Sequence, residues 1–107
     1  MRQGDLVMLE FPYSNVEGSK WRPAIVLSND TYNRYANVLL AGLYGKEQPV
    51  SVCITNADTE RHRLRKISYV SLQNIFSAEK SMIKNPSADR LVPRKMKEVI
   101  AKLQKCL

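Results

Sequence analysis

An arginine stands directly before a proline where an apolar run begins, in the stretch KWRPAIVLSNDTYNR (Lys20–Arg34). The backbone before a proline is held extended, so we expect Arg22 on the rim of the fold, at the start of a strand. A guanidinium combines a fixed positive charge with paired donors that match a phosphate. Arg22 is therefore either a residue that handles an anionic group or the solvated end of a strand.

The remaining reactive side chains offer less chemistry. The two cysteines, Cys53 and Cys106, lie far apart and match no metal-ligand or redox spacing, so we interpret them as free thiols. The single histidine, His62, lies in the charged run ERHRLRK, where a solvated loop is expected. We expect neither a metal ion nor another cofactor from these spacings.

The charge is unevenly distributed along the 107 residues, whose formal net charge is +7. Residues 1–60 hold five Lys or Arg against seven Asp or Glu and contribute −2. Residues 61–107 hold twelve Lys or Arg against three Asp or Glu and contribute +9. This asymmetry favours a polyanion or an acidic protein as a partner, and a basic surface kept for solubility explains it equally well.

The length predicts one domain, residues 1–107, with a modest core that needs no disulfide or metal. The chain has no apolar run long enough to span a membrane. Its N-terminus leads directly into a strand pattern, without the charged and apolar regions of a signal peptide. The sequence therefore predicts a cytoplasmic protein.

Apolar runs and period-two alternation predict short strands, separated by polar loops at 14–19, 29–37 and 55–64. The predicted strands are 6–11, which Pro12 closes, about 24–28, 38–43, 50–54, 67–72 and a short piece near 75–76. Pro93 suits the first position of a helix. The apolar stripe of that helix consists of Met96, Val99, Ile100, Leu103 and Leu107. Such an order predicts a mainly β fold, a small β-barrel with one C-terminal helix packed on it.

Three stretches resemble the MazF/PemK (Kid) family of toxins from type II toxin–antitoxin systems: GDLVMLEFP, WRPAIVLSNDTYNRYANVLLAGLYG and SYVSLQNIFSAEKSMI. The family pattern is a strand beginning Gly-Asp, a glycine-bearing loop, Arg-Pro-Ala leading a hydrophobic strand and a Ser-Asn-Asp-like turn. This chain has these features in order, and the similarity is most specific in its N-terminal half. The resemblance implies an SH3-like barrel of the CcdB/PemK type with a C-terminal helix, acting as a homodimer.

The same resemblance implies an activity and partners. Family toxins are mostly endoribonucleases, called mRNA interferases, that cut single-stranded RNA at short sequences without a metal ion. The implied partners are a second copy of the chain, a short acidic antitoxin, single-stranded RNA and, through the antitoxin complex, operator DNA. No membrane association is expected.

Arg22 matches the catalytic arginine of the family. In such cleavage the 2′-hydroxyl attacks the adjacent phosphorus, and a guanidinium stabilises the negative charge that develops. Because the guanidinium stays protonated, another group must take the hydroxyl proton. Glu17 stands five residues before Arg22, where some members carry a glutamate proposed as that base. An exposed loop glutamate without a catalytic role is the other interpretation.

The chain departs from the family pattern at three positions. The family's strand-end threonine falls on Tyr44, which keeps a hydroxyl, so the predicted catalytic set is Arg22, Glu17 and Tyr44. The aspartate and arginine of the family's Asp-Gln-Ile-Arg-Thr segment fall on Gln73 and Phe76, which cannot replace them. The predicted RNA-binding residues are Lys20, Trp21, Asn29, Lys46, Asn74 and Ser77. Trp21 offers either a stacking face for an unpaired base or a core or dimer-interface side chain.

Three functions therefore compete. The first is an RNA-cleaving toxin. The second is a catalytically degenerate relative that binds an antitoxin and, through it, nucleic acid; the departures at Gln73 and Phe76 favour it. The third is a CcdB-like gyrase inhibitor, which ranks last because such chains end in a Trp-Gly-Phe-like motif that is absent from Gln104–Leu107.

Overall fold

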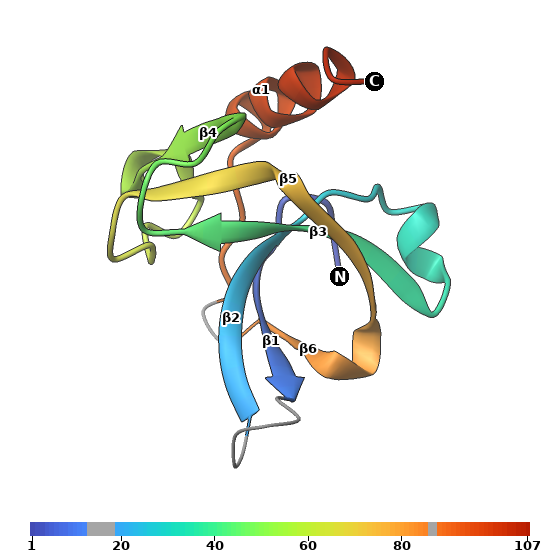
Figure 1. Ribbon diagram of the computed structural model, residues 1–107. Coiled ribbons are helices and arrows are strands. Elements are labelled where there is room, and N and C mark those ends of the chain that lie inside the picture. Colours follow the sequence, from blue (N-terminus) through green and yellow to red (C-terminus); the bar gives the residue numbers. More distant parts are fainter. Residues whose placement is uncertain (13–18, 86–87) are drawn as a thin grey trace.

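The computed structural model describes the backbone of residues 1–12, 19–85 and 88–107, and their side chains except those of residues 11, 12, 19 and 20. Within this part the chain forms a mainly β fold with one α-helix (Figure 1). The strands are β1 (Leu6–Pro12), β2 (Ser19–Val26), β3 (Asn37–Tyr44), β4 (Ser51–Ile54), β5 (Ser68–Glu79) and β6 (Ile83–Lys84). The helix is α1 (Pro93–Gln104), and short 3₁₀ turns are η1 (Tyr32–Arg34), η2 (Asn56–Asp58) and η3 (Lys80–Met82).

The strands form one antiparallel sheet in the order β4-β5-β3-β2-β1-β6. The sheet curves strongly, and the chain crosses from β5 through η3 to β6 (Figure 1). The predicted closed barrel is nevertheless wrong, because β4 and β6 stay unpaired with each other in the described part. β6 has only two residues, and β4 is next to α1, whose Lys102 Nζ donates to the Ser51 carbonyl at 2.8 Å.

Two predicted strand boundaries differ from the structure. β2 begins at Ser19 rather than near 24, because the segment before Ala24 pairs with β1. Pro23 is compatible with this position, since β2 pairs with β3 only from Ala24 onward. The two pieces predicted at 67–72 and 75–76 belong to one strand, β5, whose register against β3 shifts between Ala41 and Leu43.

Apolar side chains alternate between the two faces of the sheet and form two clusters. The inner cluster consists of Val7, Leu9, Ala24, Val26, Val38, Leu40 and Ile83. The helix-side cluster consists of Leu6, Ile25, Leu27, Ala41, Leu43, Val52, Ile54, Val70, Leu72, Leu91, Met96 and Val99. Consecutive residues such as Leu6 and Val7 thus belong to different clusters, as period-two alternation requires.

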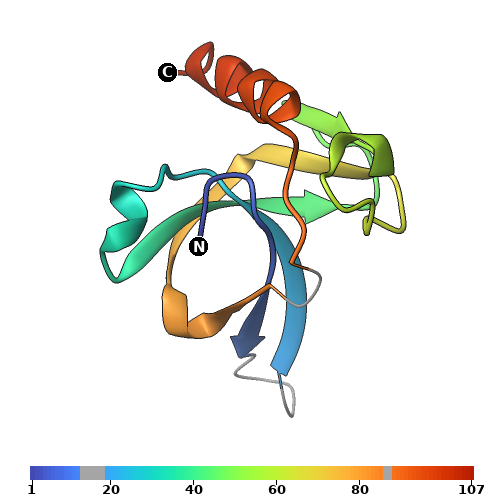
Figure 2. The same cartoon turned by 180° about the vertical axis from the view of Figure 1, so that it is seen from behind.

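The predicted helix stripe is confirmed for most of its members. Met96 and Val99 are buried in the helix-side cluster, and Ile100 and Leu103 pack partly against it. Leu107 was wrongly included, because α1 ends at Gln104 and the Leu107 side chain is 94% exposed. Seen from behind, α1 lies across the end of the sheet that carries β4 (Figure 2). No helix in the described residues is long and apolar enough to span a membrane.

The start of the chain is fastened to the segment just before α1. Gly4 has a φ of +92°, a conformation that favours glycine, and its carbonyl accepts the Leu91 N–H at 3.0 Å. The Leu6 N–H donates to the Asp89 carbonyl at 3.0 Å, and Arg90 Nε donates to Asp5 Oδ1 at 2.9 Å. The Gly-Asp pair of the sequence pattern is therefore a structural anchor for β1.

Candidate active site

Arg22 lies in the part of β2 that pairs with β1 but not with β3. Its register partner is Leu9 of β1, and its side chain is exposed. Period-two alternation puts Arg22 on the same face as Ala24, which belongs to the inner cluster. The predicted exposure of Arg22 is confirmed, but the residue lies within β2 rather than at the start of a strand.

Tyr44 and Asn74 come together on the neighbouring strands β3 and β5. Asn74 Nδ2 donates a hydrogen bond to Tyr44 Oη at 2.7 Å. Both side chains lie over Gly42, because a Cβ at Gly42 would meet Asn74 Nδ2 at 2.5 Å and Tyr44 Cε2 at 3.3 Å. The sequence pattern singled out these two residues separately, and the structure joins them.

The sheet register relates this pair to Arg22. Ala24 and Gly42 are partners in the antiparallel β2–β3 ladder. Arg22 lies two residues before Ala24 and Tyr44 lies two residues after Gly42, so both belong to the same face at corresponding positions. We call the face formed by Arg22, Tyr44 and Asn74 the Arg22 face. It combines a cation, a phenol and an amide from three adjacent strands.

The structure places Trp21 away from this face. As the neighbour of Arg22 in β2, it belongs to the opposite face, and the residue is 39% exposed. Lys84 Nζ lies 5.2 Å from the centroid of the Trp21 ring, which is a cation–π distance. Sequence reasoning missed Lys84, because β6 is too short to give a recognisable strand pattern.

The other predicted RNA-binding residues are dispersed. Asn29 Oδ1 accepts the Tyr32 N–H at 2.9 Å and thus supports η1. Lys46 is exposed beyond the end of β3, and Ser77 Oγ accepts a hydrogen bond from Asn37 Nδ2 at 3.3 Å. Lys20 pairs through its backbone with β1, and its side chain is outside the described ones. Glu17, the predicted base, lies outside the described residues.

Gln73 and Phe76, two of the three positions that depart from the family pattern, both lie in β5. Phe76 is half-buried against the inner cluster and opposite Leu40 in the β3–β5 ladder. Gln73 is exposed, and its backbone N–H donates to Ser71 Oγ at 3.3 Å. Phe76 therefore serves packing at the position where the family pattern has an arginine.

A cavity of about 700 Å³ lies beside the end of β3. Its apolar lining includes Leu6, Met8, Pro23, Leu43 and Leu64, and its basic lining consists of Arg63, Arg65 and Lys66. Among the described residues that line it, none is Asp or Glu. We call it the basic cavity. The charged run ERHRLRK was the sequence signal for it, but that run alone did not reveal the apolar floor.

The backbone of this basic loop is fixed by one buried carboxylate. Asp89 is 1% exposed and accepts the N–H groups of Arg61 at 2.8 Å, Arg63 at 2.9 Å and Arg90 at 2.9 Å. Burial raises the pKa of the Asp89 carboxyl, whereas these N–H groups and the Thr59 hydroxyl lower it. The hydrogen bonds together outweigh the burial, so the pKa is below its usual value. The carboxylate thus holds the loop by its backbone and leaves the arginine side chains at the surface.

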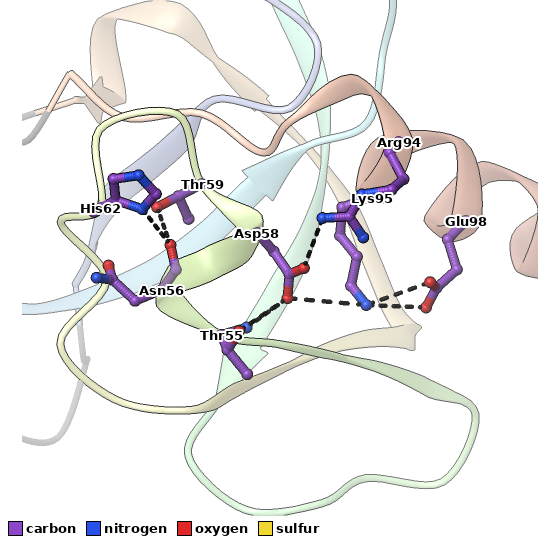
Figure 3. A network of polar contacts seen from close by, with 8 residues as sticks. All are labelled: Thr55, Asn56, Asp58, Thr59, His62, Arg94, Lys95 and Glu98. Carbon is purple, nitrogen blue, oxygen red and sulfur yellow. Dashed lines mark hydrogen bonds and ion pairs between the residues drawn. The ribbon is translucent and has the colours of Figure 1, made fainter.

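A second carboxylate joins η2 to α1 (Figure 3). Asp58 Oδ2 accepts the Thr55 N–H at 2.8 Å and lies 3.9 Å from Lys95 Nζ, and Asp58 Oδ1 lies 3.5 Å from Arg94 Nη2. Burial raises the pKa of Asp58, whereas the Thr55 hydrogen bonds and the charges of Lys95 and Arg94 lower it to a net value below normal. His62 Nδ1 lies 3.0 Å from the Asn56 carbonyl in the same network. These groups brace the start of the helix.

Comparison with known proteins adds independent information. Residues 2–107 match the model of a family described as PemK-like, MazF-like toxin of type II toxin–antitoxin system. Endoribonuclease MazF of Staphylococcus saprophyticus subsp. saprophyticus is 31% identical over 105 residues, which covers 92% of this chain and 84% of that protein.

Solved structures share the fold. A MazE–MazF structure from Deinococcus radiodurans (Form-III) has a TM-score of 0.76 at 21% identity and covers 99% of this chain and 94% of that one. A mycobacterial endoribonuclease in complex with its cognate antitoxin has a TM-score of 0.74 at 19% identity, with coverage of 98% and 92%. The open antiparallel sheet with one C-terminal helix is therefore a known architecture.

Proposed function

Because the chain belongs to the PemK-like, MazF-like toxins of type II toxin–antitoxin systems, we propose that it is an endoribonuclease that cleaves single-stranded RNA at specific sequences. The observation that carries this proposal is the Arg22 face, where Arg22 lies on the same side of the sheet as the hydrogen-bonded pair Tyr44 and Asn74. A cation on the same side as two hydrogen-bonding side chains suits a phosphodiester whose charge increases during the reaction.

In the proposed reaction the 2′-hydroxyl oxygen attacks the adjacent phosphorus. Arg22 stabilises the charge that develops on the phosphoryl oxygens, because its fixed charge and paired donors fit them. Arg22 is unsuited to take the hydroxyl proton, since a guanidinium stays protonated. We assign that proton to Glu17, whose carboxylate accepts it if it reaches the 2′-hydroxyl. The resemblance assigns no role to a metal ion, and neither do we.

We further propose that the chain acts as a homodimer. The resemblance implies it, and exposed apolar side chains at Trp21, Val50, Ile67 and Ile75 support it. Burial of these side chains between two copies removes apolar surface from water. Sedimentation velocity across micromolar concentrations should show the dimer, and a monomer throughout that range would contradict it.

We propose that an acidic antitoxin binds the basic cavity. One of the similar solved structures is a mycobacterial endoribonuclease in complex with its cognate antitoxin, and another is a MazE–MazF structure. The lining supports the assignment, because its apolar floor and its Arg63, Arg65 and Lys66 side chains suit an acidic segment with apolar side chains. Through such a partner the complex would reach operator DNA. We place all these encounters in the cytoplasm, where messenger RNA is translated.

Single-turnover cleavage of an unstructured RNA tests the enzymatic proposal. We expect the wild type to cut, and Arg22→Ala to lose at least about 10²-fold in rate, the scale for removing one electrostatic stabiliser. Arg34→Ala is the matched control, because it removes the same charge from an exposed position in η1. If wild type and Arg22→Ala are equally inactive, the degenerate, antitoxin-binding alternative replaces the enzyme.

A further inference from the structure

The hydrogen bond between Asn74 and Tyr44 has a direction. The Asn74 side-chain NH₂ is a donor only, and its nitrogen lies 2.7 Å from Tyr44 Oη. The phenol oxygen is therefore the acceptor in this bond. Its own proton must point away from Asn74, so Tyr44 keeps a donor for another group.

Gly42 makes this arrangement sterically possible. A Cβ at Gly42 would lie 2.5 Å from Asn74 Nδ2, closer than real Cβ contacts come. The amide of Asn74 thus crosses directly over the glycine to reach the phenol. The register shift between β3 and β5 occurs at this place, between Ala41 and Leu43, and it accompanies the approach of Asn74.

The ring of Tyr44 lies on the same side of the sheet as Arg22. Gly42 is the register partner of Ala24, and a Cβ on Gly42 would point to the side where the Tyr44 ring lies. Arg22 and Tyr44 occupy corresponding positions two residues beyond this pair. A phosphodiester bound by Arg22 is therefore on the side of the sheet that carries the half-buried Tyr44 and its hydroxyl.

We propose that Tyr44 is the proton donor to the leaving 5′-oxygen and that Asn74 is a positioning residue that fixes the direction of this proton. This inference rests on the proposed RNA cleavage and assigns one of its steps. As the 2′-oxygen forms its bond to phosphorus, the bond from phosphorus to the 5′-oxygen breaks. The 5′-oxygen takes the electron pair and the Tyr44 proton, and solvent water then returns a proton to the phenolate. Phenols in general hold their proton at neutral pH, as a donor must.

A substrate with a better leaving group tests this step. The wild type first maps the linkage that is cut, and the 5′-bridging oxygen of that linkage is then replaced by sulfur. A thiolate leaves without protonation, so a proton donor does not accelerate cleavage of the sulfur substrate. We expect Tyr44→Phe to slow cleavage of the oxygen substrate by about 10²–10⁴-fold, and to cut the sulfur substrate at nearly the wild-type rate.

Two further variants test the positioning role. In Asn74→Asp the carboxylate can only accept, so it draws the Tyr44 proton to itself. We expect a loss of about tenfold or more on the oxygen substrate, the equivalent of one hydrogen bond, and recovery on the sulfur substrate. Gly42→Ala displaces the Asn74 amide and should give the same pattern. Asn37→Asp is the matched control, because Asn37 also bridges β3 and β5, to Ser77, and should stay within about twofold of wild type on both substrates.

The outcomes separate the two proposals. If the wild type cuts neither substrate, the proposed endoribonuclease function fails. If the wild type cuts both, but Tyr44→Phe is slowed equally on both, Tyr44 is not the proton donor and the inference is overturned. Arg22→Ala should stay slow on both substrates, because phosphoryl charge must be stabilised whatever group leaves. Circular dichroism of each variant confirms that the sheet is retained.

Discussion

Two regions of this molecule use polar side chains in opposite ways. Near the start of α1, the buried carboxylate of Asp58 accepts the Thr55 N–H and forms ion pairs with Arg94 and Lys95 (Figure 3). The buried carboxylate of Asp89 accepts the N–H groups of Arg61, Arg63 and Arg90. On the Arg22 face the polar groups are exposed or half-exposed, and the Asn74–Tyr44 bond leaves the phenol proton directed elsewhere. In the first region the hydrogen bonds stabilise the fold, and in the second a donor is left to bind a ligand. Substitutions in the two regions should therefore change different measurements.

The largest expected effect is on the rate of RNA cleavage and comes from substitution of the proposed base that acts together with Arg22. Glu17→Gln removes the proposed base and should lower the single-turnover rate by about 10²–10⁴-fold. Because the substitution keeps the size of the side chain in a stretch predicted to be a polar loop, the urea midpoint of unfolding should change little. Glu10→Gln, in β1, is a control of the same chemistry. A Glu17→Gln enzyme as fast as wild type would remove Glu17 from the mechanism.

The next effect is on stability and falls on the carboxylate side. In Asp89→Asn an NH₂ group replaces one of the two carboxylate oxygens, which accept the N–H groups of Arg61 and Arg63. One of these N–H donors therefore loses its acceptor in a buried place. Urea unfolding at pH 7 should show a loss of about 1–3 kcal/mol in the free energy of unfolding. The matched control is Asp30→Asn, an exposed carboxylate in a surface ion pair, with an expected change below about 0.5 kcal/mol. Equal losses for the two variants would contradict the anchoring role.

The stability difference between wild type and Asp89→Asn should also depend on pH. The folded-state pKa values of Asp58 and Asp89 are lowered. Such groups contribute stability above the unfolded-state pKa of about 3.9, and that contribution is lost as pH falls through the lower folded-state value. Urea unfolding at pH 7, 5, 4 and 3 should thus show the difference from wild type shrinking below about pH 4. A difference that grows on acidification would have the wrong sign.

The smallest expected effect concerns Trp21, which faces away from Arg22. Lys84→Met should remove the cation–π contact and destabilise the fold by about 0.5–1 kcal/mol. Because Trp21 is the only tryptophan, its fluorescence reports the change directly. Lys97→Met, on the exposed side of α1, is the control and should leave the emission unchanged. Identical spectra for all three proteins would exclude this contact in solution.

Local sequence patterns predicted the elements well, and long-range pairing limited the rest. Pro93 and the apolar stripe located α1, and the Arg-Pro pair indicated that Arg22 is exposed, although not that it lies within β2. The Asn74–Tyr44 bond joins residues 30 positions apart, and it depends on a register shift that no local pattern encodes. The barrel was predicted from strand spacing and from the family resemblance, and neither reveals that β6 has only two residues.

The hydrogen bonds that join the start of β1 to residues 89–91 have a consequence for how the protein folds during synthesis. Gly4, Asp5 and Leu6 bond to residues 89–91, so the first strand completes its partners only after about six-sevenths of the chain exists. During synthesis the N-terminal strand therefore lacks these partners until residues 89–91 have been made. Contacts between residues so distant along the chain also form slowly. A ribosome that stops before residue 89 releases a chain without this anchor. The complete sheet is thus expected to form only after residues 89–91 have been synthesised.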